Sequence, residues 1–201
     1  MTMQKCFGGT LAEMASAAIS DFASAATLAG FECDVHKILV DIAPAPHRPS
    51  GLPTGRMAVY CFFLNGQALK IGIAGSESDA RFRSHHYSPN RANSTLAGSL
   101  LKHPNKIGIA AIPASSIGDW IKAHTGRINF LLPPSYGKVM LSQLEAFLHV
   151  RWRPTYEGRV LCSPQRPDGQ RGKWETTSAG RLDRVDARLG PIERRLELAD
   201  A

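Results

Sequence analysis

The feature that most constrains the fold is an apolar run followed by a tight turn in the first half of the chain. Every residue from 57 to 64 is apolar, which is the pattern of a strand covered on both faces. Asn65 and Gly66 come next, and both tolerate the positive φ of a short hairpin turn. Residues 68–73 return as a second strand. We therefore expect a buried hairpin at the centre of the fold.

The segments on either side of the hairpin alternate between helical and strand patterns. An Ala-rich helix over 10–28 and a short strand over 35–42 precede it. After it, the sequence predicts helices over 76–86, 94–103, 115–125 and 136–151, and strands over 106–112 and 127–132. The spacing of Ser76 and Asp79 resembles a capping box. We expect an α/β fold with a small central mixed or antiparallel sheet flanked by helices.

These patterns divide the chain into four parts. Residues 1–43 form an N-terminal helical arm or subdomain. Residues 44–55 form a Pro-rich linker, in which prolines and glycines exclude a helix or a central strand. Residues 56–160 form the main domain. Residues 161–201 form a basic loop and a C-terminal tail.

Positive charge is concentrated in the middle of the chain. The 201 residues carry a net charge of +7, but residues 81–182 hold 15 basic and 5 acidic side chains, whereas residues 1–80 hold 5 basic and 7 acidic ones. A polyanion such as a nucleic acid would meet this middle region. A solvated basic surface explains the charge equally well. The 43% of apolar residues excludes a wholly disordered polymer.

The spacing of the cysteines and the hydropathy of the N-terminal segment indicate in which cellular compartment the protein is expected. The four cysteines are scattered, with no Cys-x-x-Cys pair, so neither a structural zinc site nor a disulfide framework is indicated. The apolar stretch over 11–31 is interrupted by Glu13, Asp21 and several serines, and no basic leader with a cleavage site precedes it. We expect a cytoplasmic protein with no membrane partner.

Four short motifs follow one another in the main domain. Ala58-Val59-Tyr60 and Lys70-Ile71-Gly72 lie on the two strands of the hairpin, Arg81 and His85 lie four residues apart on the next predicted helix, and Glu145 lies on a later one. This order resembles the GIY-YIG nuclease superfamily, whose hairpin bears two tyrosine motifs. The resemblance covers residues 56–160. It implies a divalent-metal-dependent endonuclease with Tyr60, Lys70, Arg81, His85 and Glu145 as catalytic residues and Glu145 as the metal ligand.

Two positions depart from the superfamily's pattern. Lys70 replaces the second tyrosine, in a variant with Lys-Ile-Gly in place of Tyr-Ile-Gly, and this still leaves a cation near a phosphate. Residues 153–158 resemble the superfamily's Pro-x-x-Asn-Gly segment, but Glu157 stands where Asn is usual. Glu157 is open to three interpretations: a second metal ligand, a repulsive charge that lowers activity, or a misaligned position.

The chemistry of these residue types supports the same roles independently. A hard divalent ion bound through one carboxylate such as Glu145, with water and phosphate as its other ligands, suits Mg²⁺ or Mn²⁺. Arg81 supplies a permanent planar cation for the phosphate. His85, one helical turn away, is placed to hydrogen-bond the nucleophile or a phosphate oxygen. Tyr60 would take a proton from water if a neighbouring cation such as Lys70 lowers its pKa.

The register of the hairpin tests whether Lys70 belongs to this site. A strict two-residue turn pairs Tyr60 with Ile71 and places Lys70 on the opposite face, because side chains alternate between faces. A three-residue turn or a bulge at Gly66 places Tyr60 and Lys70 on the same face. The hypothesis requires the second arrangement.

Basic residues outside the catalytic set would contact the nucleic-acid backbone. The contacts that we predict are Arg83, His86, Arg91, Arg153, Arg171 and Lys173. His86 is also the alternative to His85 as the functional histidine. Further candidates for backbone contacts, which the sequence does not rank, are Lys102, Lys106, Arg127, Lys138, Arg151 and Arg159.

The sequence therefore favours an endonuclease that hydrolyses DNA phosphodiester bonds, in restriction, phage defence or mobile-element biology. Two alternatives stay open: a catalytically inactive nucleic-acid-binding or adaptor module of the same fold, and a ribonuclease with the same site. A homodimer would explain double-strand cleavage by a one-site enzyme, and a partner protein would supply targeting.

Overall fold

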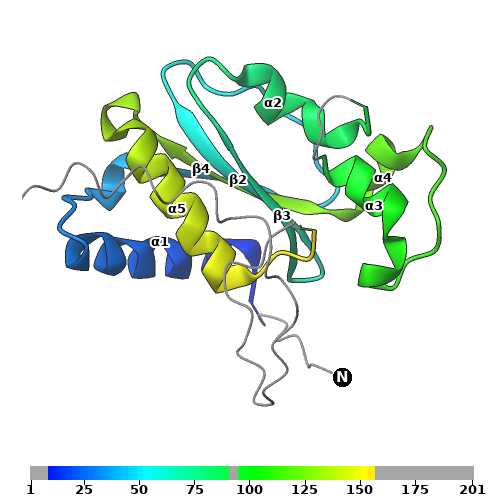
Figure 1. The fold of residues 1–201 in the computed structure, drawn as a ribbon, viewed down its shortest axis with the longest axis horizontal. Helices are drawn as coiled ribbons and strands as arrows, with labels where there is room; N and C mark the ends of the chain where they lie inside the picture. The colour runs from blue at the N-terminus through cyan, green and yellow to red at the C-terminus, as the bar shows by residue number, and fades with distance from the viewer. Residues whose placement is uncertain (1–8, 91–94, 157–201) are drawn as a thin grey trace, which may run out of the picture. The chain divides into compact units, whose positions relative to one another are not determined.

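The structure of the protein, a computed structural model, describes residues 9–90 and 95–156. The chain divides into two compact units, residues 1–162 and 163–201, and the described residues all belong to the first. This unit is a mixed α/β fold in which helices lie on both faces of a four-stranded antiparallel sheet (Figure 1). The strands, in spatial order, are β1 (Leu39–Ala43), β4 (Gly126–Leu132), β2 (Met57–Leu64) and β3 (Gln67–Ala74).

Five α-helices and four short 3₁₀ helices complete the described part of the chain. The α-helices are α1 (Leu11–Leu28), α2 (Asp79–Arg83), α3 (Leu96–Lys102), α4 (Ile117–His124) and α5 (Gly137–Trp152). The 3₁₀ helices are η1 (Val35–Lys37), η2 (His85–Tyr87), η3 (Pro104–Ile107) and η4 (Pro134–Tyr136). None of the described helices is both long and apolar enough to cross a membrane.

The central hairpin forms where the sequence predicts it. Asn65 and Gly66 have φ values of 49° and 77° and make a two-residue turn between Leu64 and Gln67. The ladder then shifts register between Phe62 and Phe63, which is a β-bulge in β3. The bulge places Tyr60 opposite Gly72 and Phe62 opposite Lys70. Tyr60 and Lys70 therefore share a face, as the hypothesis requires, although the bulge is not at Gly66.

The bulge is held by the chain that follows α5. The amides of Thr155 and Tyr156 donate to the carbonyls of Ala68 and Leu69 at 3.1 and 2.9 Å. These bonds satisfy carbonyls that an outer strand leaves without a neighbouring strand. Residues 154–156 thus fix the register of the strand that carries Lys70.

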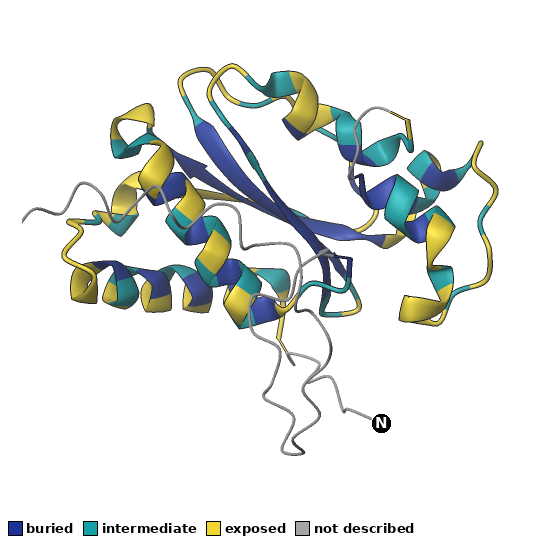
Figure 2. Cartoon of the chain, viewed as in Figure 1, coloured by how far each residue is buried: buried dark blue, intermediate teal, exposed yellow. Residues whose placement is uncertain are grey.

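The sheet separates two apolar cores, and nearly all of β2, β3 and β4 is buried (Figure 2). Helices α1 and α5 cover one face. These helices contribute Ala18, Phe22, Leu144 and Leu148, among others, to the apolar core on this face. The side chains pack against the odd-numbered residues of β2. The small residues of α1 let the helix lie close to the sheet.

The opposite face is covered by α2, α3 and α4 (Figure 1). Phe82 of α2, Leu96 of α3 and Ile121 of α4 pack on Tyr60 and other even-numbered residues of β2. This face also carries the buried polar side chains of β3 and β4, so the candidate site lies between this face and its helices.

The N-terminal segment that the sequence sets apart as an arm belongs, in its described residues, to the same sheet and core. β1 pairs with β4 along its whole length, and α1 begins with a capping box between Thr10 and Glu13. Burial of Phe22 and the pairing of β1 tie residues 9–43 to the domain. Residues 44–55 contain no helix or strand, as their prolines predict.

Two local predictions are wrong. Residues 106–112 do not form a strand: Pro104 starts the 3₁₀ turn η3, Gly108 ends it at φ 70°, and Ile109 and Ile112 pack against the core without a ladder. The expected capping box at Ser76 is also absent, because α2 starts at Asp79 after Ser78 with no side-chain cap. The Asp79 carboxylate instead accepts a hydrogen bond from the amide of Leu52 at 2.7 Å.

Candidate functional site

Tyr60 lies at the centre of the face covered by α2, α3 and α4. It sits in the middle of β2, opposite Gly72 of β3 and Asn129 of β4, and it is 0% exposed. Its ring crosses the backbone of β3 at Gly72: a Cβ atom there would stand 2.7 Å from the Tyr60 hydroxyl. Glycine is therefore needed at position 72 because the phenol occupies the space of a side chain.

The Tyr60 hydroxyl is hydrogen-bonded to His86. The distance from Oη to Nε2 is 2.8 Å, and the Nδ1 atom of the same ring accepts from the amide of Leu96 at 3.2 Å. Because Nδ1 is an acceptor, the neutral ring carries its proton on Nε2. His86 therefore donates to Tyr60, and the phenolic oxygen is the acceptor.

Burial keeps His86 neutral. Desolvation, followed by the positive charges of Lys70, Arg127 and Arg81, lowers the pKa of His86 from 6.5 to about 3. The ring is therefore a fixed donor to Tyr60 at neutral pH rather than a residue that exchanges protons there.

Arg81 and Glu145 also influence the pKa of the Tyr60 hydroxyl. Burial raises the pKa of the Tyr60 hydroxyl, while a hydrogen bond from Arg81 and its charge oppose that rise, and the Glu145 carboxylate adds to it. Arg81 is exposed on α2, and Glu145 is partly buried on α5. Arg81 and Glu145, which are 64 positions apart in the sequence, thus act on one phenol from two different helices.

Lys70 is the fourth predicted residue at this place. It is 3% exposed and lies on the same face of the sheet as Tyr60, opposite Phe62. Its ammonium lowers the pKa of His86 more than any other charge does. The cation of the Lys-Ile-Gly motif is therefore part of the environment of the Tyr60–His86 pair.

His85 has a different position from the one that the sequence predicts. Helix α2 ends at Arg83, where the Ser84 hydroxyl donates to the carbonyl of Ala80 at 2.9 Å, and His85 starts the separate turn η2. Arg81 and His85 are therefore not on one helical face. His86 is buried with both ring nitrogens engaged by protein groups, so it serves the phenol rather than a surface contact.

The remaining predicted residues lie at the surface or outside the described part. Arg83 is exposed and pairs with Asp79 at 3.4 Å, and Arg153 is exposed at the C-terminal cap of α5 with φ 45°. Arg91, Glu157, Arg171 and Lys173 lie outside the described residues.

Two further residues of this site, Arg127 and Asn129, were not assigned to it by sequence analysis, which took Arg127 as a candidate contact to the nucleic-acid backbone and did not single out Asn129. Both are on β4, both are 2% exposed, and they are opposite Phe62 and Tyr60. The Arg127 Nε atom donates to Asn129 Oδ1 at 2.6 Å. The signal was present, because two polar residues separated by one apolar position interrupt an apolar strand and must share a face.

Among residues 9–90 and 95–156, no group of three or more His, Cys, Asp or Glu side chains could hold a metal ion. The donor set nevertheless fits one kind of cation. Mg²⁺ and Mn²⁺ are bound through one or two carboxylates, with water and substrate phosphate as the other ligands. Glu145 is the carboxylate that acts on the site.

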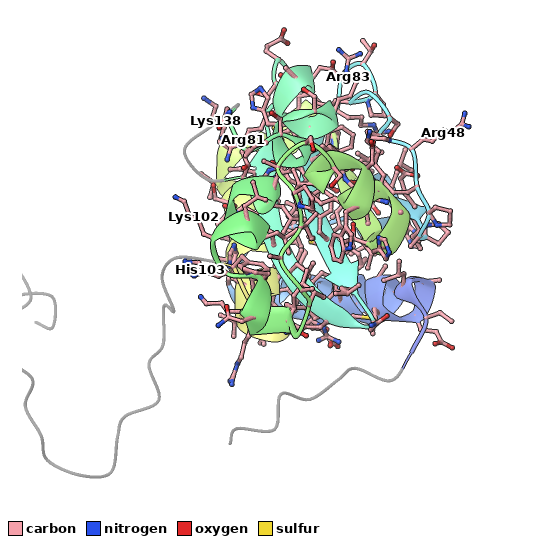
Figure 3. All side chains as sticks on the ribbon, turned by 90° about the vertical axis from the view of Figure 1, so that its right-hand side faces the viewer. Arg48, Arg81, Arg83, Lys102, His103 and Lys138 are labelled. Carbon is pink, nitrogen blue, oxygen red and sulfur yellow. The ribbon has the colours of Figure 1, made fainter. Side chains whose placement is uncertain are left out.

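Basic side chains extend from Arg81 along one side of the domain. Figure 3 shows Lys138, Arg81, Lys102 and His103 projecting on the same side, whereas Arg48 projects on the other. All five are exposed and come from different elements or loops. This row offers a polyanion a path across α5, α2 and α3.

Comparisons with protein-family models, with curated proteins and with solved structures found no match to this chain.

Proposed function

We propose that this protein is a divalent-metal-dependent endonuclease of the GIY-YIG type that hydrolyses DNA phosphodiester bonds. One observation carries the proposal. The hydroxyl of Tyr60 in β2 accepts a hydrogen bond from Arg81 of α2, and its ionisation is also influenced by the negative charge of Glu145 of α5. Lys70 on the same face and Gly72 beneath the phenol support the proposal, because both belong to the second hairpin motif.

Phosphodiester hydrolysis needs a water that loses a proton and a cation at the non-bridging oxygens. Arg81 is the exposed member of the site, so a phosphate would bind its guanidinium. Tyr60 lies beside it and accepts hydrogen bonds from both Arg81 and His86. Two donors stabilise a phenolate more than a phenol, so they oppose the rise in the Tyr60 pKa that burial causes. The phenolate that they favour is the form that receives the water's proton.

The carboxylate of Glu145 would hold the Mg²⁺ or Mn²⁺ ion. Such an ion, with water and phosphate as its other ligands, supplies charge neutralisation at the phosphate and at the leaving oxygen. Glu145 is half-buried on α5, and its charge, like that of Arg81, acts on the ionisation of Tyr60.

The row of basic side chains supports a polyanionic substrate. Lys102, His103 and Lys138 flank Arg81 on one side of the domain (Figure 3). Contacts of this kind bind the sugar-phosphate backbone without reading sequence, and they make affinity depend steeply on salt. RNA offers the same backbone charge, so a competition between DNA and RNA substrates distinguishes the deoxyribonuclease from a ribonuclease.

A second candidate is a non-cleaving nucleic-acid-binding module of the same fold. Its supporting observation is that Tyr60 is 0% exposed and its hydroxyl is already bonded to His86. A phenol that stays buried is part of the apolar core and cannot exchange a proton with a water molecule at the surface. This module would bind DNA in a salt-sensitive, metal-independent manner and would leave it intact.

Plasmid cleavage in Mg²⁺ or Mn²⁺ distinguishes the two candidates. The parent protein is expected to cut, and Glu145→Gln and Arg81→Ala are expected to lose at least about 100-fold in rate. Matched controls are Glu32→Gln and Arg48→Ala, which remove the same groups from exposed positions elsewhere.

Cleavage at equal rates by all five proteins would reject the assigned site. Binding by the parent without cleavage, unchanged by chelation of the metal, would establish the second candidate instead.

A further inference from the structure

A permanently charged side chain is buried beneath the candidate site. Arg127 is 2% exposed, and its guanidinium carbon lies 4.1 Å from the ring centre of Phe82, 4.9 Å from that of Tyr60 and 5.3 Å from that of Phe62. Within the described residues, no carboxylate lies within the 4.0 Å of an ion pair. Three aromatic faces therefore take the place of an acidic partner.

The hydrogen bonds of Arg127 leave part of its donor capacity unused. Nε donates to Asn129, whose amide nitrogen donates to Asp41 at 2.9 Å. Nη1 lies 3.5 Å from the hydroxyl of Tyr87, which is a weak contact. Nη2 is buried and has no hydrogen-bond partner among the described residues. A buried cation in this state is costly to folding.

Arg127 lies between two tyrosine–histidine pairs. Tyr60 is bonded to His86, and the Tyr87 hydroxyl lies 2.7 Å from Nε2 of His47, whose Nδ1 atom is 2.7 Å from the carbonyl of Thr125. Because a carbonyl only accepts, His47 donates through Nδ1 and, when neutral, accepts from Tyr87. The two phenols thus differ: Tyr87 donates a hydrogen bond to His47, whereas Tyr60 accepts one from His86.

This difference identifies the phenol that Arg127 can serve. The oxygen of Tyr60 accepts the hydrogen bond from His86, so the hydroxyl proton of Tyr60 is not used in that bond. The hydroxyl proton of Tyr87, in contrast, is used in the hydrogen bond to His47. A phenolate spreads its negative charge into the ring, and a guanidinium under that ring is attracted more strongly than by the neutral phenol.

We propose that Arg127 is a positioning residue for Tyr60: it is the buried counter-charge that stabilises the phenolate, which is the form of Tyr60 that can accept a proton from water. The cost of the unpaired guanidinium is partly relieved when Tyr60 is ionised, so the charge of Arg127 favours the ionised form of the phenol over the neutral one. The effect on cleavage rests on the proposed nuclease function, but the effect on the ionisation of Tyr60 does not.

Other charges around Tyr60 must be held constant in the test. The ionisable groups that act on Tyr60 or on its partner His86 come from every side: Lys70 from β3, Arg81 from α2, His85 from η2, Arg127 from β4 and Glu145 from α5. Arg127 differs from the exposed Arg81 because solvent and substrate do not screen it.

The experiment compares Arg127→Met, which fills the space without charge, and Arg127→Gln, which keeps hydrogen bonding, with Arg127→Lys, which keeps charge. Fluorotyrosine incorporated at Tyr60 brings the ionisation of this phenol to lower pH, and its fluorine resonance is followed against pH. We expect the midpoint to rise by about one unit or more in the two neutral variants and less in Arg127→Lys. Circular dichroism checks that each variant is folded.

If the parent cleaves DNA, the ascending limb of its pH–rate profile, along which Tyr60 ionises, should move to higher pH by the same amount in the neutral variants. An unchanged fluorotyrosine midpoint in a folded neutral variant would overturn the proposal. So would failure of both neutral variants to fold, because that result assigns Arg127 a purely structural role. A parent that does not cleave, combined with a shifted midpoint, refutes the nuclease function and leaves the role of Arg127 intact.

Discussion

The phenol of Tyr60 lies across Gly72, so that a Cβ atom at position 72 would stand 2.7 Å from the hydroxyl oxygen and 2.9 Å from the ring. These two residues come from the two hairpin motifs and are directly opposite each other in the β2–β3 ladder. The glycine of Lys-Ile-Gly is therefore a spatial requirement of the tyrosine on the neighbouring strand.

Gly72→Ala should displace the Tyr60 ring and separate its hydroxyl from His86. Overpacking of this kind costs about 1–3 kcal/mol of stability, and we expect any cleavage activity to fall at least as strongly as in Tyr60→Phe. Thermal unfolding and plasmid cleavage measure the two effects. Gly75→Ala is the control, since the nearest atom to a Cβ there is 3.9 Å away. Equal behaviour of the two variants would mean that the phenol has room to move.

The neutral state of His86 predicts a specific loss of stability in acid. Its pKa is about 3 in the folded protein, against 6.5 for an unperturbed histidine, so the unfolded chain binds more protons between these values. Stability is therefore complete above pH 6.5 and decreases as pH falls toward 3. The slope from this one group approaches about 1.4 kcal/mol per pH unit.

Urea unfolding at a series of pH values measures this slope. In His86→Gln the slope should be smaller, while His36→Gln, an exposed control, should leave it unchanged. Some slope remains in the first variant because burial also lowers the pKa of His47. A slope unaffected by loss of His86 would contradict a neutral, buried ring.

Local sequence patterns predict most of the sheet but not its register. The apolar run and the Asn65-Gly66 turn define β2, β3 and their connection closely. The bulge depends on amides of Thr155 and Tyr156, which approach Ala68 and Leu69 only after the chain has passed through α5. Contacts over such a separation leave no periodic signal in the strand itself.

The same limit explains which histidine the sequence analysis favours. A continuous helix would place His85 one turn after Arg81, but the Ser84 side chain bonds to the carbonyl of Ala80 and the helix ends. The chain then turns, and His86 rather than His85 bonds to Tyr60.

Burial of Arg127 could not be predicted from the sequence for a different reason. The polar pattern of Arg127 and Asn129 is visible in the sequence, but a basic residue in a strand is usually interpreted as a surface position. Only the packing of Phe82 and Phe62 around it reveals that the charge is buried.

The role of the N-terminal segment can be tested through Phe22. This side chain is 1% exposed, and its ring lies 5.6 Å from that of Phe147 on α5. Phe22→Ala should destabilise the whole domain by about 3–5 kcal/mol, because a large cavity forms between α1 and α5. Phe31→Ala, at a position that is 39% exposed, should have little effect on thermal unfolding. If both variants unfold like the parent, residues 9–43 are a dispensable arm.

The row of basic side chains predicts how DNA affinity responds to salt. Lys102 and Lys138 flank Arg81 in Figure 3 and lie outside the Tyr60 cluster. Each phosphate contact that is lost lowers the slope of log affinity against log salt by about 0.9, so the double variant Lys102→Gln/Lys138→Gln should lower it by up to about 2. Fluorescence anisotropy with a labelled duplex measures the slope. Arg48→Gln removes one charge from an exposed position that projects on the opposite side in Figure 3 and should leave the slope close to that of the parent. An equal change of slope per charge removed in the two variants would show that DNA does not follow the row, because net charge alone would then set the affinity.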